Sequence, residues 1–280
     1  MTSQSAGKEL EERLSKMDEK SDIIETCLHI AAEEYTNLNI RKYLDFLDTT
    51  ADELSKRLGS KRSPRDVIKV LNAFLFDEKK FVGNVTEYND PRNSFLNEVL
   101  ERKTGIPITL SLIYMELARR VDLHLLGIGM PGHFLLKFVG SESFFVDPFN
   151  HGEVLDEEGC RKKFIAFSRG QIEFKSQFLD PVTKRQMVFR LLSNLKAIYL
   201  GSQDFARALR IIELMILVNP SSTVEFRDRA LVYHQMHRDL EAIQDLEKYA
   251  ALVKDSEERA TITRFIRDLK INIETQRMYV

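Results

Sequence analysis

The stretch that decides the fold reads GIPITLSLIYMELARR and runs from Gly105 to Arg120. Pro107 suits the first position of a helix, because its φ is fixed and its missing N–H is not needed there. Apolar residues from Leu110 to Val121 then recur on one broad helical face. Beyond this helix the apolar residues come in short runs separated by turn residues, as is typical of strands. The sequence therefore predicts a covered helix followed by antiparallel strands at Leu123–Met130, His133–Val139 and Phe144–Val146.

The chain before this stretch is predicted to be helical. Apolar residues follow helical spacing over Asp22–Tyr35 and again over Leu44–Leu58. Ser63 and Pro64 form an N-cap followed by proline, which predicts a third helix. The same signal at Asn89–Pro91 predicts a fourth, with Gly105 suited to the left-handed cap at its end.

From residue 181 to the C-terminus the chain returns to helices, and here the sequence repeats. Tyr199 and Ala208 recur 34 residues later as Tyr233 and Ala242. Pro220 ends the first repeat, as a stacked helix pair requires. The period and the small residues at the helix contacts resemble the tetratricopeptide pattern. Stacked repeats of this kind need a closing helix, which we expect over residues 262–269.

The second repeat departs from the pattern at two positions. Phe205 of the first repeat falls on Asp239, which leaves the neighbouring Leu240 to supply the lost apolar contact. Lys254 stands where a proline is expected. The predicted fold is therefore α+β and mainly helical, with a C-terminal helical repeat. The repeat signature comprises Tyr199, Phe205, Ala208, Pro220, Tyr233 and Ala242.

Composition limits the function classes. A formal net charge of -2 gives no reason to expect nucleic acid or a membrane surface as a partner. The two cysteines, Cys27 and Cys160, are far apart and form no C-x-x-C pair, so neither a metal site nor a disulfide is predicted. No cofactor motif was found. The charged N-terminus lacks the apolar core of a signal peptide, and we expect a cytoplasmic protein.

Three motifs suggest chemistry: the start of the Gly105–Arg120 helix, the sequence PGHF around His133, and the sequence VDP around Asp147. Together they resemble the transglutaminase and cysteine-protease core, in which a helix N-terminus carries the nucleophile and two strands carry His and Asp. The resemblance implies that His133 takes a proton and that Asp147 orients its ring. The family cysteine falls on Pro107, which has no nucleophile. The resemblance thus carries over His133 and Asp147 but not the covalent step, and it leaves enzymatic activity open.

Other residues are candidates for the same pocket. Ser111 lies one helical turn after Pro107, and Asn93 and Asn150 are candidate polar liners. Cys160 is a candidate relocated thiol, because Arg161–Lys163 would favour its thiolate. The alternatives are structural: a hydrogen-bonded His, an Asp-Pro turn, capping asparagines, a buried helix cysteine and a solvated basic face.

The longest motifs match one family most closely. The segments NSFLNEVLERKTGIPITLS (93–111), GMPGHFLLK (129–137) and FVDPFNHG (145–152) resemble the SirB-type bacterial family. In that family a transglutaminase-like core is joined to C-terminal tetratricopeptide repeats. Its members are linked by name to regulation of invasion genes, and a similar core occurs in an F-box ubiquitin-ligase subunit. The resemblance begins at about residue 22, and the charged stretch before it is expected to be a tail or a helix. The expected organisation is therefore this tail or helix at 1–21, a helical block and core at 22–180, and repeats at 181–280.

Two classes of function fit this organisation. The first is a cytoplasmic interaction or regulatory factor that binds a protein or peptide through its repeats, through the cleft near His133, or both. Its core would then be a pseudoenzyme or a scaffold. The second is a hydrolase or acyl-transfer enzyme that uses His133 and Asp147 with an unusual nucleophile or an activated water.

Overall fold

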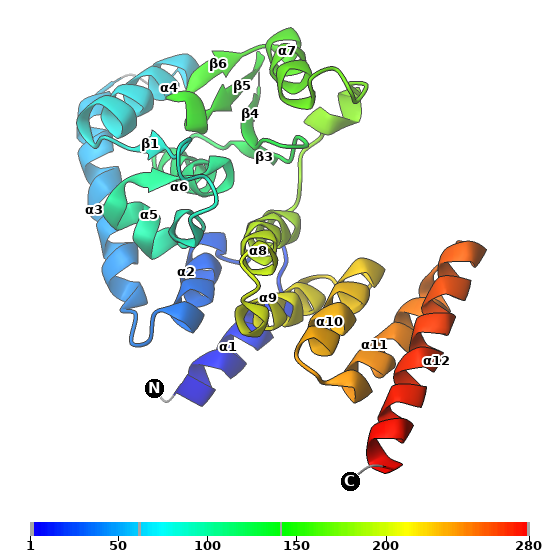
Figure 1. Cartoon of the computed structure of the whole chain (residues 1–280). Helices are drawn as coiled ribbons and strands as arrows, with labels where there is room; N and C mark the ends of the chain where they lie inside the picture. The colour runs from blue at the N-terminus through cyan, green and yellow to red at the C-terminus, as the bar shows by residue number, and fades with distance from the viewer. Residues whose placement is uncertain (1–2, 61–62, 141, 279–280) are drawn as a thin grey trace. The chain divides into compact units, whose positions relative to one another are not determined.

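The computed structural model describes residues 3–60, 63–140 and 142–278. The chain divides into two compact units, Met1–Leu191 and Leu192–Val280, which are described separately (Figure 1). This division lies further along the chain than the boundary after residue 180 that the sequence suggested. The mainly helical α+β fold with a small antiparallel sheet is confirmed.

The first unit begins with helices whose starts are set by local caps. Asp22 accepts a hydrogen bond from Glu25 N, and Ser63 accepts one from Asp66 N. Within the stretch expected to be a tail or a helix, the structure has a helix over Ser3–Ser15, on which Leu10 and Leu14 are fully buried. The helices are α1 (Ser3–Ser15), α2 (Ile23–Glu34), α3 (Ile40–Leu58) and α4 (Pro64–Asn72), and α4 continues into the π-helical turn η1 (Ala73–Glu78).

The segment before the central helix differs from the prediction. Pro91 opens only the 3-10 turn η2 (Pro91–Asn93), because Asp90 caps Arg92 N over this short turn. The α-helix α5 (Leu96–Arg102) starts after it, and Lys103, with φ of 56°, is its left-handed cap. Gly105 is not that cap. It lies in the strand β2 (Thr104–Gly105), which pairs in parallel with β1 (Val82–Gly83).

The central helix α6 (Pro107–Arg120) is buried over most of its length, as its apolar sequence indicates. The sheet that follows is an antiparallel meander in the order β3-β4-β5-β6, and α6 lies against β4. The first two predicted strands are present but shorter, the third is longer by one residue at each end, and His133 precedes its strand instead of beginning it. The strand β6 was not predicted. The strands are β3 (Leu126–Ile128), β4 (Leu135–Val139), β5 (Ser143–Asp147) and β6 (Glu153–Leu155), followed by the turn η3 (Pro148–Asn150) between β5 and β6 and the helix α7 (Glu157–Ser168) after β6.

The second unit contains the predicted helical repeat. Ala208 and Ala242 are fully buried where neighbouring helices pack, which explains why the repeat needs small residues there. Leu240 does not replace the contact of Phe205, because it is 55% exposed. The helices are α8 (Lys184–Gly201), inside which the two units divide, α9 (Phe205–Val218), α10 (Thr223–Gln235), α11 (Asp239–Leu252) and α12 (Ser256–Met278).

The repeat is closed by α12, as predicted. Ile262, Ile266 and Leu269 are buried on one side of this helix, and α12 packs against α11. Across the residues that the structure describes, no helix has the length and apolar character needed to cross a membrane.

Candidate functional site

His133 and Asp147 meet at one end of the sheet in the first unit. The register pairs Leu136 of β4 with Val146 of β5, so the residues before β4 lie beside the end of β5. His133 Nε2 lies 2.9 Å from Asp147 Oδ2. The His133 side chain is 14% exposed, whereas that of Asp147 is fully buried. The imidazole is therefore reachable from solvent, while the carboxylate behind it is not.

Asp147 is held as a carboxylate by its neighbours. Burial alone would raise its pKa, but hydrogen bonds from His133 and Asn150 and the charge of Lys163 outweigh burial and lower the pKa to about 2. Asn150 Nδ2 and Lys163 Nζ lie 2.7 Å and 3.0 Å from Asp147 Oδ2. An ionised carboxylate only accepts hydrogen bonds, so His133 Nε2–H is the donor and Nδ1 remains as the basic nitrogen.

Lys163 is a site residue that the sequence reading missed. The sequence offers a solvated basic face as one alternative for Arg161–Lys163, but Lys163 is only 26% exposed and bridges Asp147 and Glu153. Lys163 lies near the buried side of α7, because Cys160, three residues before it, and Phe164, one residue after it, are both fully buried. That spacing marks the inward face of α7 and was the available signal.

The start of α6 connects to His133 through a short series of contacts. Gly105, two residues before Pro107, pairs with Gly83 in the small parallel sheet. The ring of Phe149 lies where Gly83 lacks a side chain, since a Cβ there would be 2.6 Å from Phe149 Cδ2. The same ring meets the His133 ring edge-on, with 5.9 Å between centroids. Pro107 is buried at this end of α6 and offers no nucleophilic atom.

Neither alternative nucleophile is placed for chemistry. The hydroxyl of Ser111 is fully buried in α6 and has no hydrogen-bond partner among the described residues, hence no base. Cys160 is fully buried in an apolar cluster with Leu135, Phe145 and Phe164. Burial, followed by the charges of Asp147 and Asp156, raises the pKa of this thiol to about 12. The charge of Lys163 favours the thiolate but is outweighed by burial and by these acidic charges, so the thiol has the surroundings of a buried helix cysteine.

The two candidate asparagines have different surroundings. Asn150 belongs to the Asp147 network. Asn93 is fully buried and anchors the loop before α5: its Nδ2 donates to Glu87 O at 2.7 Å, and its carbonyl accepts from Thr109 Oγ1 at 2.8 Å. Asn93 thus ties this loop to the first turn of α6 and acts on the site only through that loop.

Two further aromatic side chains pack on direct neighbours of His133. Tyr88 meets Phe149 edge-on at 6.3 Å between ring centroids and is 39% exposed. The ring of Phe167 occupies the space where Gly132 lacks a side chain, and Phe167 is 58% exposed. Gly132 also has φ of 77°, which a side chain would strain. These surfaces could contact an apolar group presented to His133. Within the described ranges, no three His, Cys, Asp or Glu side chains are grouped to hold a metal ion.

Comparison with known proteins places this geometry in a family. A model described as the transglutaminase-like superfamily matches residues 41–193, and one described as a tetratricopeptide repeat matches residues 195–267. A UPF0162 protein of Xylella fastidiosa is 34% identical over 246 residues, covering 84% of this chain and 85% of that protein. Protein SirB1 of Salmonella typhimurium is 26% identical over 204 residues, covering 72% of this chain and 76% of that protein. F-box only protein 21 of Mus musculus is 35% identical over 103 residues, 34% of this chain and 16% of that protein.

Proposed function

Because the chain belongs to the transglutaminase-like superfamily, in a SirB-type combination with tetratricopeptide repeats, we propose that it is a regulatory interaction factor. It binds a protein or peptide partner through the repeats, and its core does not form a covalent intermediate.

One observation carries this proposal: the base of the site is present, and the nucleophile is not. His133 and Asp147 form a hydrogen-bonded pair, but Pro107 stands at the first turn of α6. Covalent acyl transfer needs a nucleophile that is exposed, activated and within hydrogen-bond reach of the base. The buried thiol of Cys160, with a pKa of about 12, is protonated at neutral pH and does not meet this requirement.

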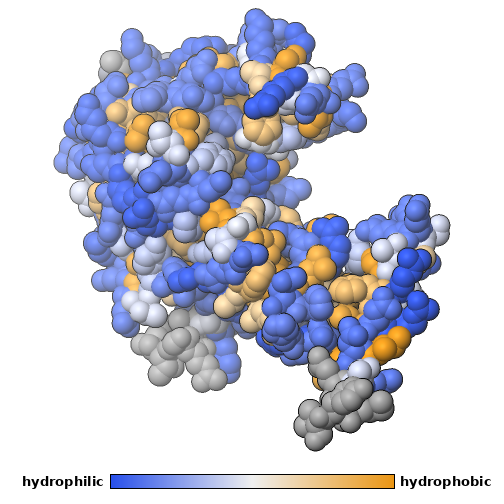
Figure 2. All heavy atoms as spheres, viewed as in Figure 1, coloured by the Kyte–Doolittle hydropathy of each residue, from blue (hydrophilic) through white to orange (hydrophobic). Residues whose placement is uncertain are grey.

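The repeat unit offers a surface for a partner. Val224 and Leu231 are seven residues apart on α10, hence on one face, and are 42% and 44% exposed. On the face seen in Figure 2, hydrophilic residues cover most of the surface and hydrophobic residues form small groups. Exposed apolar side chains set among polar ones are typical of surfaces that bind a peptide or an amphipathic helix.

A partner-capture experiment tests the proposal. The full chain is used as bait, and captured proteins are quantified by mass spectrometry against Val224→Ser/Leu231→Ser and His133→Ala. We expect a specific set of partners to be lost with the α10 double variant and kept with His133→Ala. Leu252→Ser is the matched control, because Leu252 is 52% exposed but lies on α11. A partner set that all four chains capture equally would contradict binding through α10.

A second candidate is a hydrolase that activates water. The observation in its favour is the Asp147 network, which fixes the His133 ring and leaves Nδ1 as a base at a partly exposed position. Such an enzyme would lose turnover in His133→Ala while its thermal unfolding midpoint changed little. The interaction factor would show no turnover that depends on His133.

A further inference from the structure

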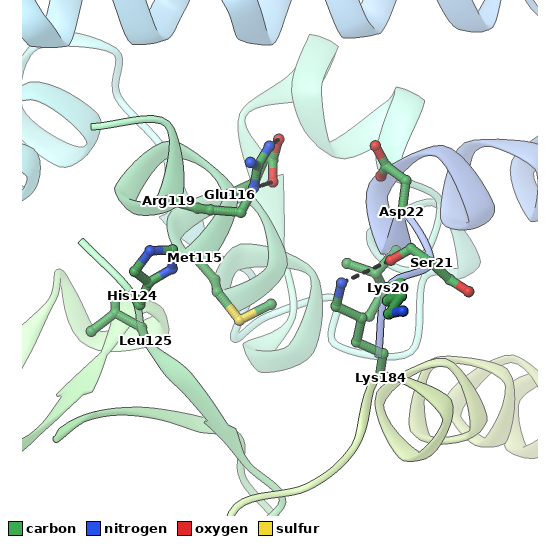
Figure 3. A pocket seen from close by; sticks show the side chains of 10 residues that line it. Lys20, Ser21, Asp22, Met115, Glu116, Arg119, His124, Leu125 and Lys184 are labelled. Atoms are coloured by element: carbon green, nitrogen blue, oxygen red, sulfur yellow. Dashed lines mark hydrogen bonds and ion pairs between the residues drawn. The ribbon is translucent and has the colours of Figure 1, made fainter. Parts of the chain in front are cut away.

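The first unit contains a pocket that none of the site residues lines. It has a volume of about 360 Å³ and is enclosed by residues 20–23, the second half of α6, residues 124–125 and Lys184 (Figure 3). This size lies within the range of small-molecule sites, roughly 300–1,000 Å³. The pocket is formed by Met115, Glu116 and Arg119 of α6, whereas the His133 site adjoins the first turn of that helix.

Two carboxylates line this pocket. Glu116, whose side chain is only 7% exposed, accepts hydrogen bonds from Arg119 Nε at 2.9 Å and from Arg120 Nε at 2.7 Å. Asp22 is the N-cap of α2, accepts from Glu25 N at 2.9 Å and keeps its charge, which acts on Arg119. The pocket lining thus carries three cations, Lys20, Arg119 and Lys184, against these two carboxylates.

Two ammonium groups at the pocket remain without a carboxylate. Among the described residues, no Asp or Glu oxygen lies within ion-pair distance of Lys20 Nζ or Lys184 Nζ. Lys184 Nζ instead donates to the carbonyl oxygen of Ser21 at 2.8 Å, which fixes its position beside the pocket. A cation that is already held in place needs less ordering when an anion binds to it.

The floor of the pocket is apolar. Figure 3 shows the Met115 side chain reaching toward the space between His124 and Arg119 on one side and Lys184 on the other. Ile23 and Leu125 also line the pocket and are almost fully buried. A flexible thioether adapts to apolar groups of varied shape.

We propose that this pocket binds a small organic anion, in which a carboxylate or phosphate joins an apolar body. The anionic group contacts Lys20 and Lys184, and the apolar body lies against Met115. Charge selects the ligand, because the three cations of the lining outnumber its two carboxylates and neither Lys20 nor Lys184 is in an ion pair among the described residues. The pocket shares no lining residue with the His133 site or with the exposed face of α10, so this proposal does not depend on the proposed function.

Benzoate and phenyl phosphate test this proposal as matched probes, with benzyl alcohol as the neutral control. Binding to the full chain is followed through the methyl resonance of Met115 in carbon-labelled protein, assigned with Met115→Leu. We expect saturable shifts with at least one anion and none with the alcohol. Lys20→Gln/Lys184→Gln should weaken binding by about tenfold or more, the loss typical of a charge-assisted contact. Lys69→Gln, at an exposed position of α4, should bind like the natural chain.

Three results would overturn the proposal: no saturable shift with either anion, equal binding of benzyl alcohol, or unchanged affinity in the double variant. Saturation by only one anion supports the site and distinguishes carboxylate from phosphate recognition. Should the double variant fail to fold, Lys20→Gln alone provides the comparison, because Lys20 is exposed and its ammonium group acts on Asp18 through charge.

Discussion

Two buried aspartates, one in each unit, show how similar burial leads to different chemistry. Asp147 in the core and Asp245 in the repeats are 0% and 2% exposed. Asp245 is held by both arms of Arg229, with Nε and Nη2 at 2.6 and 3.0 Å. Asp147 is held by His133, Asn150 and Lys163. Both carboxylates are fully partnered, as buried charges must be.

The partner decides what each carboxylate does. Arg229 stays charged under all ordinary conditions, so its pair with Asp245 joins α10 to α11 and does nothing else. His133 uses only one ring nitrogen in its pair with Asp147 and keeps the second, so this pair orients a group that could act on a ligand. The Arg229–Asp245 pair is therefore structural. The His133–Asp147 pair is also structural, but it leaves one nitrogen of the imidazole free of Asp147.

The largest effect is expected in the repeats. Arg229→Met leaves Asp245 buried without its bidentate partner, and we expect the free energy of unfolding of this unit to fall by about 3 kcal/mol. Hydrogen exchange of the α10 and α11 amides measures the loss in the second unit separately. Arg238→Met is the control, because Arg238 and Glu241 are both exposed and their pair should contribute almost nothing. Equal losses in the two variants would remove the distinction between buried and exposed pairs.

A smaller loss is expected in the core. Asp147→Asn keeps the shape of the side chain but removes the charge that faces Lys163 and His133. The lowered pKa of Asp147 corresponds to a contribution of about 2 kcal/mol at neutral pH. Urea unfolding of the variant and of the natural chain gives the difference. An unchanged free energy of unfolding would mean that the network stabilises nothing.

The pH dependence of that difference gives a sharper test. The pKa of Asp147 is about 2 in the folded chain and 3.8 ordinarily, so the unfolded state binds the proton more tightly. The stabilisation is therefore fully present above about pH 4 and is lost as pH falls toward about 2. The difference in the free energy of unfolding between the natural chain and Asp147→Asn should show this loss. Taking this difference cancels the titration of the other carboxylates, which both proteins share. A difference that grew as pH fell through this window would contradict the assignment.

The smallest effect is expected for His133→Ala. His133 is partly exposed, and Asn150 and Lys163 still hold Asp147 in the variant, so we expect a loss of only about 1 kcal/mol. Thermal and urea unfolding beside Asp147→Asn measure the order of the two effects. A larger loss for His133→Ala than for Asp147→Asn would make the imidazole, and not the carboxylate, the centre of this network.

Local signals predicted much of the fold. Apolar spacing and caps found α2, α3, α4 and α6, since a helix is encoded by residues close in sequence. The 34-residue repeat likewise predicted the helices α8 to α11, because each repeat carries its own local helix signals. The strand β6 was missed, because it has three residues, of which Glu153 and Val154 are exposed, and shows no alternation.

The site was less accessible to such reasoning. His133 and Asp147 were proposed from a family resemblance, and their hydrogen bond depends on the register of β4 and β5. Lys163 enters the site only because α7 returns over β5 and β6. The burial of Cys160, which decides its pKa, likewise comes from tertiary packing that no short sequence pattern records.

The most direct test of the central claim is a substrate screen of the natural chain beside His133→Ala. Both proteins are incubated with peptide libraries, acyl esters and an amine acceptor, and products and covalent adducts are measured by mass spectrometry. Because Pro107 offers no nucleophile and Ser111 and Cys160 are buried, we expect identical background turnover and no acyl adduct on either chain. Hydrolysis or amine transfer by the natural chain that disappears in His133→Ala would contradict the claim and establish an enzyme.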